Sequence, residues 1–277
     1  MKKLVAILLI LSLVLSFAGC KVETTVDSTQ PTQIHREDMG HIAETVLYHK
    51  DGIKVTATKL EQTINGGTIH VTIVNNTELP VSFASDDIIV NGITVTDGYC
   101  IETPAGGTAE GKIDISYRSM DNAHITNIAY IESPDARIFE NVEFTMLDTA
   151  SFRIETSLNG SHAQLMPESG TVIYDKNGIK VQILGCVAGE RVTDARLLVT
   201  NNTDGAIGVK CENPMADGKE LNTWMFDTVY AGTSRYCCFE FAGIDHQNVT
   251  AELDLYSIGT EKTLIAELGS HSFPFNN

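Results

Sequence analysis

The chain has 277 residues and a formal net charge of −17, from 36 acidic and 19 basic side chains. It contains no cluster of arginine and lysine, so the composition argues against nucleic-acid binding and predicts repulsion from anionic lipid head groups. Acidity of this kind serves solubility, and it would attract cationic peptides or divalent ions.

The N-terminus has the parts of an export signal. The first three residues, MKK, form a basic segment with two lysines, and residues 4–17 form an apolar run too short to span a bilayer comfortably. The run ends in SFAGC at residues 16–20, which resembles the bacterial lipobox, where cleavage precedes a cysteine that then carries lipid. We therefore predict a lipoprotein signal peptide at 1–19 and a lipid on Cys20, which anchors the chain at the extracellular face of the bacterial cell membrane. An ordinary signal peptide is the alternative.

Residues 20–43 are rich in Thr, Glu, Asp and Gln, which predicts a flexible tether after the lipidated cysteine. The stretch HREDMGH at 35–41 carries histidines and carboxylates that could meet on a helix. No apolar face fixes it, so we interpret it as a solvated segment and predict no metal site. Removal of Lys2 and Lys3 with the signal leaves 17 basic residues, and 17 − 36 gives a mature charge of −19.

A repeated sequence motif divides the rest of the chain into two parts. YHKDGIKV at 48–55 returns as YDKNGIKV at 174–181, an offset of 174 − 48 = 126. The same offset relates three further pairs, which are Asn75-Asn76-Thr77 with Asn201-Asn202-Thr203, Asn91-Gly92 with Asp217-Gly218, and Ala105-Gly106 with Ala231-Gly232. We predict two copies of one module at 44–156 and 170–277, joined by a linker at 157–169. The alternative is one large β domain in which the motif occurs twice by chance.

In the first copy, apolar residues alternate with polar ones around Ile53–Ala57 and Ile69–Ile73, which predicts strands with one buried face. Asp51 and Gly52 between two such runs are typical of a tight hairpin turn. Further strands are predicted at Asp87–Val90, Gly92–Val95, Gly111–Tyr117, Ile125–Ile131 and Arg137–Met146, and residues 151–156 form a candidate last strand.

The second copy has the same alternation at Ile179–Ile183 and Ala195–Val199. Its further predicted strands are Glu220–Asp227, Tyr236–Phe241, Val249–Tyr256 and Thr263–Leu268. Since no stretch after the signal has a sustained helical period, the fold class is predicted to be all-β. Short strands with turns between them favour an antiparallel β-sandwich in each copy, with a barrel as the alternative.

Each copy contains Y-x-K-[DN]-G-I-K-V, a strand ending in N-N-T, an N-G or D-G turn, and A-G before another strand. This order resembles the immunoglobulin-like, telokin-like domains of unknown function found in lipoproteins of Gram-positive bacteria. The resemblance implies two tandem antiparallel immunoglobulin-like β-sandwiches after the signal peptide. It brings no catalytic residues with it.

Cysteines are distributed unevenly. Apart from Cys20, the first copy has only Cys100, whereas the second copy has four. None of these four has a cysteine 126 residues earlier, so the copies share no disulfide. Buried thiols, one disulfide within the second copy, and a metal or redox site all remain open for Cys186, Cys211, Cys237 and Cys238.

The sequence lacks the short motifs of nucleophilic, zinc, phosphate and calcium sites. We therefore predict a protein that is not an enzyme, with no catalytic residue and no cofactor. Aromatic side chains gather in the second copy, where they either fill the core or form a ligand-binding platform. These candidate residues are Trp224, Phe226, Tyr230 and Tyr236.

The leading interpretation is a lipid-anchored scaffold that binds an envelope protein or a glycan, with the ligand unknown. One alternative is a carbohydrate-binding module that uses the aromatic residues of the second copy. Another is a solute-binding lipoprotein of a transporter, which requires α/β lobes with long helices.

Overall fold

The computed structural model describes residues 40–63, 66–161, 164, 166, 170–243, 246–259 and 261–275. In these residues the chain is built almost entirely of strands, which confirms the all-β prediction. Residues 38–277 form one compact unit. Within it, the buried apolar residues form two separate clusters, one from Leu47 to Ile154 and one from Ile179 to Phe273. We call the parts around these two clusters half one and half two.

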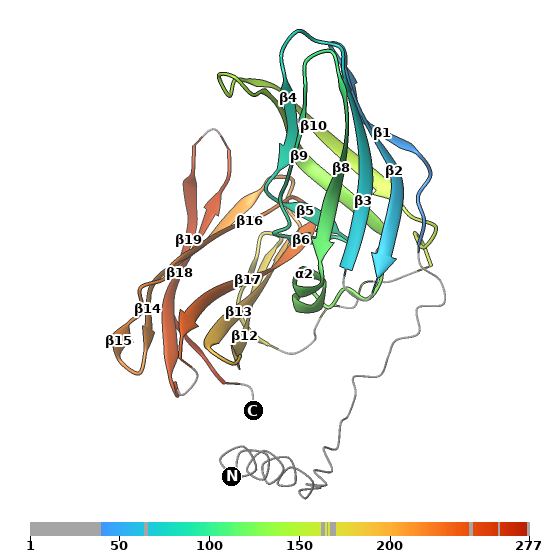
Figure 1. The fold of residues 1–277 in the computed structure, drawn as a ribbon. Coiled ribbons are helices and arrows are strands. Elements are labelled where there is room, and N and C mark those ends of the chain that lie inside the picture. Colours follow the sequence, from blue (N-terminus) through green and yellow to red (C-terminus); the bar gives the residue numbers. More distant parts are fainter. Residues whose placement is uncertain are drawn as a thin grey trace, which may run out of the picture. The chain divides into compact units, whose positions relative to one another are not determined.

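Half one is a β-sandwich (Figure 1). One sheet has the strand order β1 (Thr45–Lys50), β2 (Ile53–Thr63), β3 (Gly66–Asn75) and β8 (Thr108–Ser116). The facing layer contains β4 (Val81–Ser85), β5 (Ile88–Val90), β6 (Ile93–Val95), β7 (Tyr99–Thr103), β9 (Tyr130–Glu140) and β10 (Met146–Glu155). Alternate side chains of both layers meet in the core, because successive residues of a strand face opposite ways.

Half two follows the same plan. One layer holds β11 (Thr171–Lys176), β12 (Ile179–Ala188), β13 (Val192–Asn201) and β17 (Thr233–Ala242). The other holds β14 (Ile207–Ala216), β15 (Lys219–Glu220), β16 (Met225–Val229), β18 (Val249–Ser257) and β19 (Thr263–Phe273). The named strands within each half pair antiparallel, as predicted.

The turns that repeat in the sequence have matching backbones. Asp51 and Gly52 have φ angles of 49° and 82°, and Asn177 and Gly178 have 52° and 81°. Positive φ at both central residues matches the twist of a hairpin, and Asn, Asp and Gly adopt it at low cost. The predicted hairpins β1–β2 and β11–β12 therefore form. The strand register shifts at the same place in both, between Val46 and Tyr48 in β1 and between Val172 and Tyr174 in β11.

Two buried asparagines make the same hydrogen bonds in the two halves. Asn75 Nδ2 donates to Leu79 O (2.8 Å) and Pro104 O (3.0 Å), and its Oδ1 accepts from Thr77 N (3.0 Å). Asn201 Nδ2 donates to Gly205 O (2.8 Å) and Tyr230 O (3.2 Å), and its Oδ1 accepts from Thr203 N (3.0 Å). Every partner is displaced by 126 residues. Each asparagine thus satisfies the backbone of two loops that would otherwise be left unpaired.

The structure corrects several predicted strands. Residues 125–129 are not a strand, and β9 begins only at Tyr130. Their backbone is satisfied by side chains, since Asn91 Oδ1 accepts from Ala129 N (2.8 Å) and Tyr130 N (3.2 Å). Residues 141–145 turn between β9 and β10, and residues 221–224 separate β15 from β16. Strands β4, β7 and β14, and the six-residue helix α2 (Tyr117–Asn122), were not predicted.

Candidate functional site

The two halves meet along a strand pair that the repeat did not predict. β6 of half one pairs with β17 of half two in parallel, with Ile93 opposite Ser234 and Thr94 opposite Arg235. Ser234 N donates to Gly92 O at 2.9 Å. This contact, which we call the seam, merges one layer of each half into a single ten-stranded sheet (Figure 1).

Arg235 is the centre of the seam, and only 5% of it is exposed. Its Nη1 lies 2.9 Å from Asp87 Oδ2 and donates to Thr228 O at 2.9 Å. Its Nη2 donates to Thr96 Oγ1 at 2.6 Å and lies 3.2 Å from Asp227 Oδ1. Asp87 and Thr96 come from half one, so the guanidinium joins two loops of that half to strands β16 and β17. A planar, five-donor group suits such a junction better than a lysine.

The charges at the seam perturb one another. Burial raises the pKa of Asp87, and the nearby Arg235 offsets only part of that rise. Burial likewise raises the pKa of Asp227. Burial alone would lower the pKa of Arg235, but Asp227 and Asp87 together raise it, so the guanidinium stays charged. Arg235 forms ion pairs with both carboxylates, those of Asp87 and Asp227, so this cluster has a structural role in holding the two halves together.

A second polar contact crosses the seam beside the first. Tyr230 OH donates to Asp135 Oδ2 at 2.9 Å, and Ser85 Oγ donates to the other oxygen of Asp135 at 3.2 Å. Burial and the neighbouring Asp135 raise the pKa of Tyr230, so the phenol stays protonated as a donor. Tyr230 therefore has a structural role, because its hydroxyl links half two to half one.

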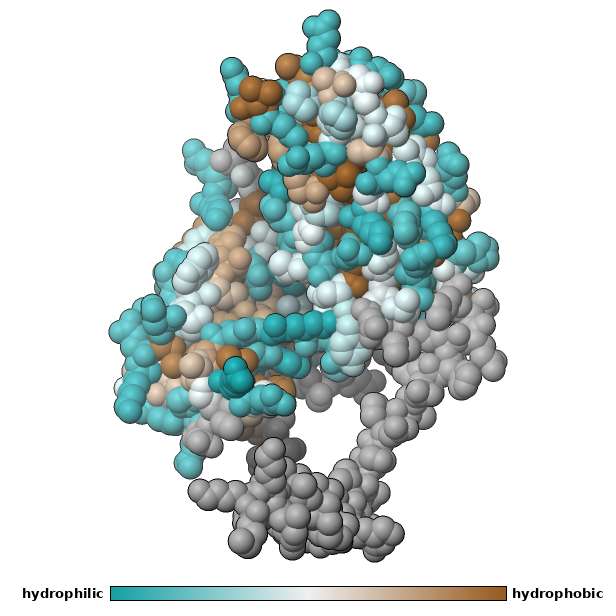
Figure 2. Space-filling model, viewed as in Figure 1, coloured by the Kyte–Doolittle hydropathy of each residue, from teal (hydrophilic) through white to brown (hydrophobic). Residues whose placement is uncertain are grey.

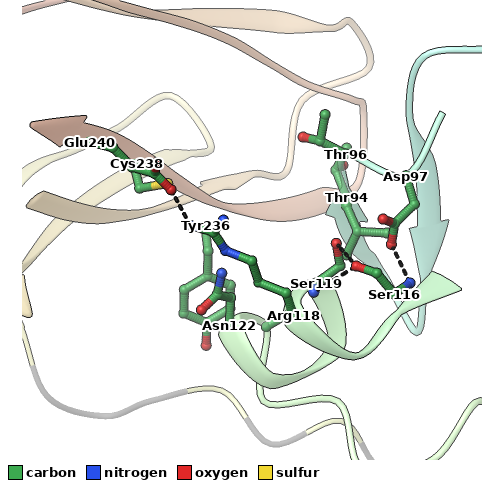
Figure 3. A pocket seen from close by; sticks show the side chains of 12 residues that line it. Thr94, Thr96, Asp97, Ser116, Arg118, Ser119, Asn122, Tyr236, Cys238 and Glu240 are labelled. Atoms are coloured by element: carbon green, nitrogen blue, oxygen red, sulfur yellow. Dashed lines mark hydrogen bonds and ion pairs between the residues drawn. The ribbon is translucent and has the colours of Figure 1, made fainter. Parts of the chain in front are cut away.

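A cleft of about 310 Å³ lies at the seam beside α2 (Figure 3). Arg118 of α2 forms an ion pair with Glu240 of β17 across it. Asp97 Oδ2 accepts from Ser116 N at 3.0 Å, and Ser116 Oγ accepts from Ser119 N at 3.1 Å. The lining is mostly hydroxyl, amide and charged groups from both halves, so the cleft suits a small polar ligand held by hydrogen bonds. Two further cavities of about 460 and 670 Å³ are also lined from both halves.

The four aromatic candidates do not form one surface. Trp224 is 73% exposed and lies between β15 and β16. Phe226 packs on Tyr256, with ring centroids 6.3 Å apart, and Lys262 Nζ lies 3.8 Å from its centroid. Tyr236 packs on His124 of half one at 5.6 Å and lines the cleft. Tyr230 and Tyr236 thus belong to the contact between the halves, and Trp224 makes no ring contact with any described residue.

All five cysteines after Cys20 are free thiols. Cys186, Cys211 and Cys237 are buried, as one of the three interpretations predicted, and Cys100 and Cys238 are exposed. Cys237 and Cys238 face opposite sides of β17 because side chains alternate along a strand. Burial raises the pKa of both Cys186 and Cys211 to about 12, so these thiols are unreactive near neutral pH.

Cys20 and most of the 35–41 stretch lie outside the described residues. Within the described part, no group of three or more His, Cys, Asp or Glu side chains has the geometry of a metal site. The helices of that part include none with the length and apolar character needed to cross a bilayer.

Sequence reasoning missed Arg235 and Asp87, although a signal existed. Arg235 occupies the same parity on β17 as Cys237, Phe239 and Phe241, all of which are buried. A single charged residue on the inward face of a strand needs a buried partner. The partner itself could not be located from sequence, because Asp87 lies 235 − 87 = 148 residues away.

Comparison with protein-family models finds no match, and comparison with curated proteins finds none either. Among solved structures, a conserved domain protein from Bacillus anthracis aligns over 83% of this chain and 86% of its own, with 10% identity and a TM-score of 0.27. Red sea bream transglutaminase aligns over 83% of this chain with 10% identity and a TM-score of 0.23. Amycolatopsis orientalis exo-chitosanase aligns over 78% with 9% identity and a TM-score of 0.25. The chain spans 32% of that transglutaminase and 26% of that chitosanase, and these distant likenesses carry no functional argument.

Proposed function

We propose that the protein is a non-enzymatic, lipid-anchored binding scaffold at the extracellular face of a bacterial membrane. The sequence MKK, the short apolar run and the SFAGC motif support the anchor at Cys20. The matched hydrogen bonds of Asn75 and Asn201 support two tandem copies of one immunoglobulin-like module. A tether after Cys20 would give the two copies reach from the membrane surface, and it would end before Ile42, which pairs with Thr156 of half one and packs on its core.

The observation that carries the scaffold role is the seam. A continuous sheet and the buried Arg235 cluster hold the two halves in one arrangement. Loops of both halves are thereby presented with fixed spacing, which lowers the entropy cost of binding a partner through both. A pair of modules on a flexible linker would lose this advantage.

Two experiments test the proposal. Cells that express the full chain or Cys20→Ser are grown with a radiolabelled fatty acid, and we expect the label on the parent and not on the variant. The mature parent and Arg235→Met are then used to capture proteins from envelope extract, and we expect a specific partner that the parent retains better. A parent chain without the fatty-acid label, or equal label on both chains, would contradict the anchor, and equal capture by both forms would contradict the need for a fixed seam.

A carbohydrate-binding role is the second candidate, and the exposure of Trp224 favours it. An exposed indole stacks well on a sugar ring. Trp224 is also the single tryptophan of the chain, so its fluorescence reports its surroundings directly. We expect titration with solubilised peptidoglycan to shift the emission if the ring binds glycan. No shift, together with equal retention of parent and Trp224→Ala on immobilised glycan, would exclude this role for Trp224.

The transporter alternative has no support in the fold. It requires long helices alternating with parallel strands, whereas the helix α2 has six residues and the parallel strand pair β6–β17 lies at the seam.

A further inference from the structure

Four apolar side chains project from one end of half one, and we call them the apolar tip. They come from the turn between β9 and β10, from the first residue of β10 and from the loop before β4. Their exposed fractions are 50% for Leu79, 67% for Val142, 76% for Phe144 and 61% for Met146. Hydrophobic residues are visible where the β9–β10 turn lies, at the upper left of Figure 2. Apolar side chains gathered in this way on a soluble domain mark a binding surface more often than a lone exposed leucine does.

The tip is held in one shape. Glu140 is buried, and its carboxylate accepts hydrogen bonds from Val142 N and from Glu143 N, the latter at 2.9 Å. Glu140 N also donates to Thr145 O at 2.9 Å, which closes the turn. Phe144 has a φ of 54°, a left-handed conformation that is strained for a bulky residue. Backbone strain of this kind is retained where the surroundings fix it, and it occurs frequently in ligand-binding loops.

The two loops of the tip are tied together. Asn141 N donates to Pro80 O at 3.0 Å, and Ser82 Oγ donates to Asn141 Oδ1 at 2.7 Å. Leu79 therefore lies next to the anchored turn that carries Val142 and Phe144. The two loops thus hold their exposed apolar side chains at fixed spacing.

Half two shows that folding does not require the apolar residues. Its corresponding loops make the same connection, since Ile258 N donates to Ala206 O at 2.9 Å. There, Gly205 stands at the position of Leu79, and the turn between β18 and β19 contains Ile258, Gly259, Glu261 and Lys262. The same construction thus exists with a more polar tip, in which Leu264 at the start of β19 is 45% exposed. Folding of this construction therefore does not explain the exposed Val142 and Phe144.

We propose that the apolar tip docks into an apolar pocket with a basic rim on a partner protein of the envelope. This inference rests on the scaffold function proposed above and names one of its binding surfaces. Exposed Glu78 and Glu143 flank the tip, and the chain carries a net charge of −17. A basic rim would complement these charges, whereas an anionic bilayer surface or a second copy of this chain would be repelled.

Photo-crosslinking in the cells that produce the protein tests this assignment. Benzoylphenylalanine is incorporated into the full chain in place of Phe144, and in a matched control in place of Glu261 on the polar tip. We expect one protein to be crosslinked from the first site and not from the second, with the crosslink mapped by mass spectrometry to an apolar pocket that Lys or Arg surrounds. Crosslinks to lipid, to glycan or to another copy of this chain would overturn the proposal, as would no crosslink or equal crosslinking from both sites.

Binding of the purified partner then provides the quantitative test. We expect Phe144→Gly to weaken binding at least tenfold, about the effect of losing one anchor side chain, and Glu261→Gly to leave it unchanged. Glycine adopts a φ of 54° without strain, so Phe144→Gly should unfold at the same temperature as the parent or a higher one. A partner that both variants bind as tightly as the parent does would refute the tip and leave the scaffold function standing. Absence of the fatty-acid label from the parent chain would refute the anchor and leave the tip result unaffected.

Discussion

Replacement of Arg235 by methionine should destabilise the protein by about 3 kcal/mol. Methionine has a similar volume but removes both charged contacts and leaves Asp87 and Asp227 buried without a cation. Breaking a buried ion pair from one side costs about 3–5 kcal/mol. The side chains of Asp87 and Asp227 are 12% and 20% exposed, so water reaches them in part and the lower end of that range applies.

Arg118→Met is the matched control, because Arg118 also forms an ion pair across the seam. Its side chain is 66% exposed, and an exposed pair contributes at most about 1 kcal/mol. Urea unfolding followed by circular dichroism measures both variants. We expect the parent to unfold in one transition and Arg235→Met in two, since the halves then lose their shared cluster. Equal losses in the two variants, or a loss below about 1 kcal/mol for Arg235→Met, would refute the reasoning.

Asn75→Ala and Asn201→Ala should each lower the free energy of unfolding in urea by about 3 kcal/mol, because each leaves several buried backbone groups unpaired. A twofold difference between the two losses would show that the halves are not built alike. Burial raises the pKa of Asp87, so the folded state takes up a proton at a higher pH than the unfolded state does. The free energy of unfolding of the parent, relative to that of Asp87→Asn, should therefore fall as the pH rises through the raised pKa. A pH-independent difference in unfolding titrations would contradict this. Of the five cysteines after Cys20, a thiol reagent added to the native chain should label the exposed Cys100 fastest. It should label Cys238 more slowly, because burial raises the pKa of that thiol to about 11, and the other three only after unfolding. These three are Cys186, Cys211 and Cys237.

Much of the fold could be predicted because its causes are local. Alternation of apolar residues around Ile53–Ala57 and Ile179–Ile183 predicts a strand wherever one face is buried. Asp51-Gly52 and Asn177-Gly178 predict hairpins because few residues tolerate two successive positive φ angles. Prediction failed at residues 125–129, where Ile125, Ile128 and Ala129 are buried in irregular chain. Its backbone is satisfied by Asn91, which lies 38 residues before Ala129.

The candidate sites show the same division. The sequence identified Trp224 as an aromatic candidate, but only the structure shows that this side chain is exposed. Only the structure shows, too, that Tyr230 and Tyr236 lie at the seam between the two halves. The exposure of Phe144 could not be predicted either, because its turn is tied through Asn141 to Pro80, which lies 61 residues earlier in the chain (141 − 80 = 61).

The sequence by itself determined the strand content and the repeated turns, since these depend on residues within a few positions of one another. Only the tertiary structure decided that β6 and β17 merge two sandwiches into one sheet and that Arg235 meets Asp87 and Asp227. A strand edge can pair with any other edge of suitable shape, and a buried charge can pair with any opposite charge within reach. Which partner it finds depends on how the two halves pack, and that packing is a property of the whole chain.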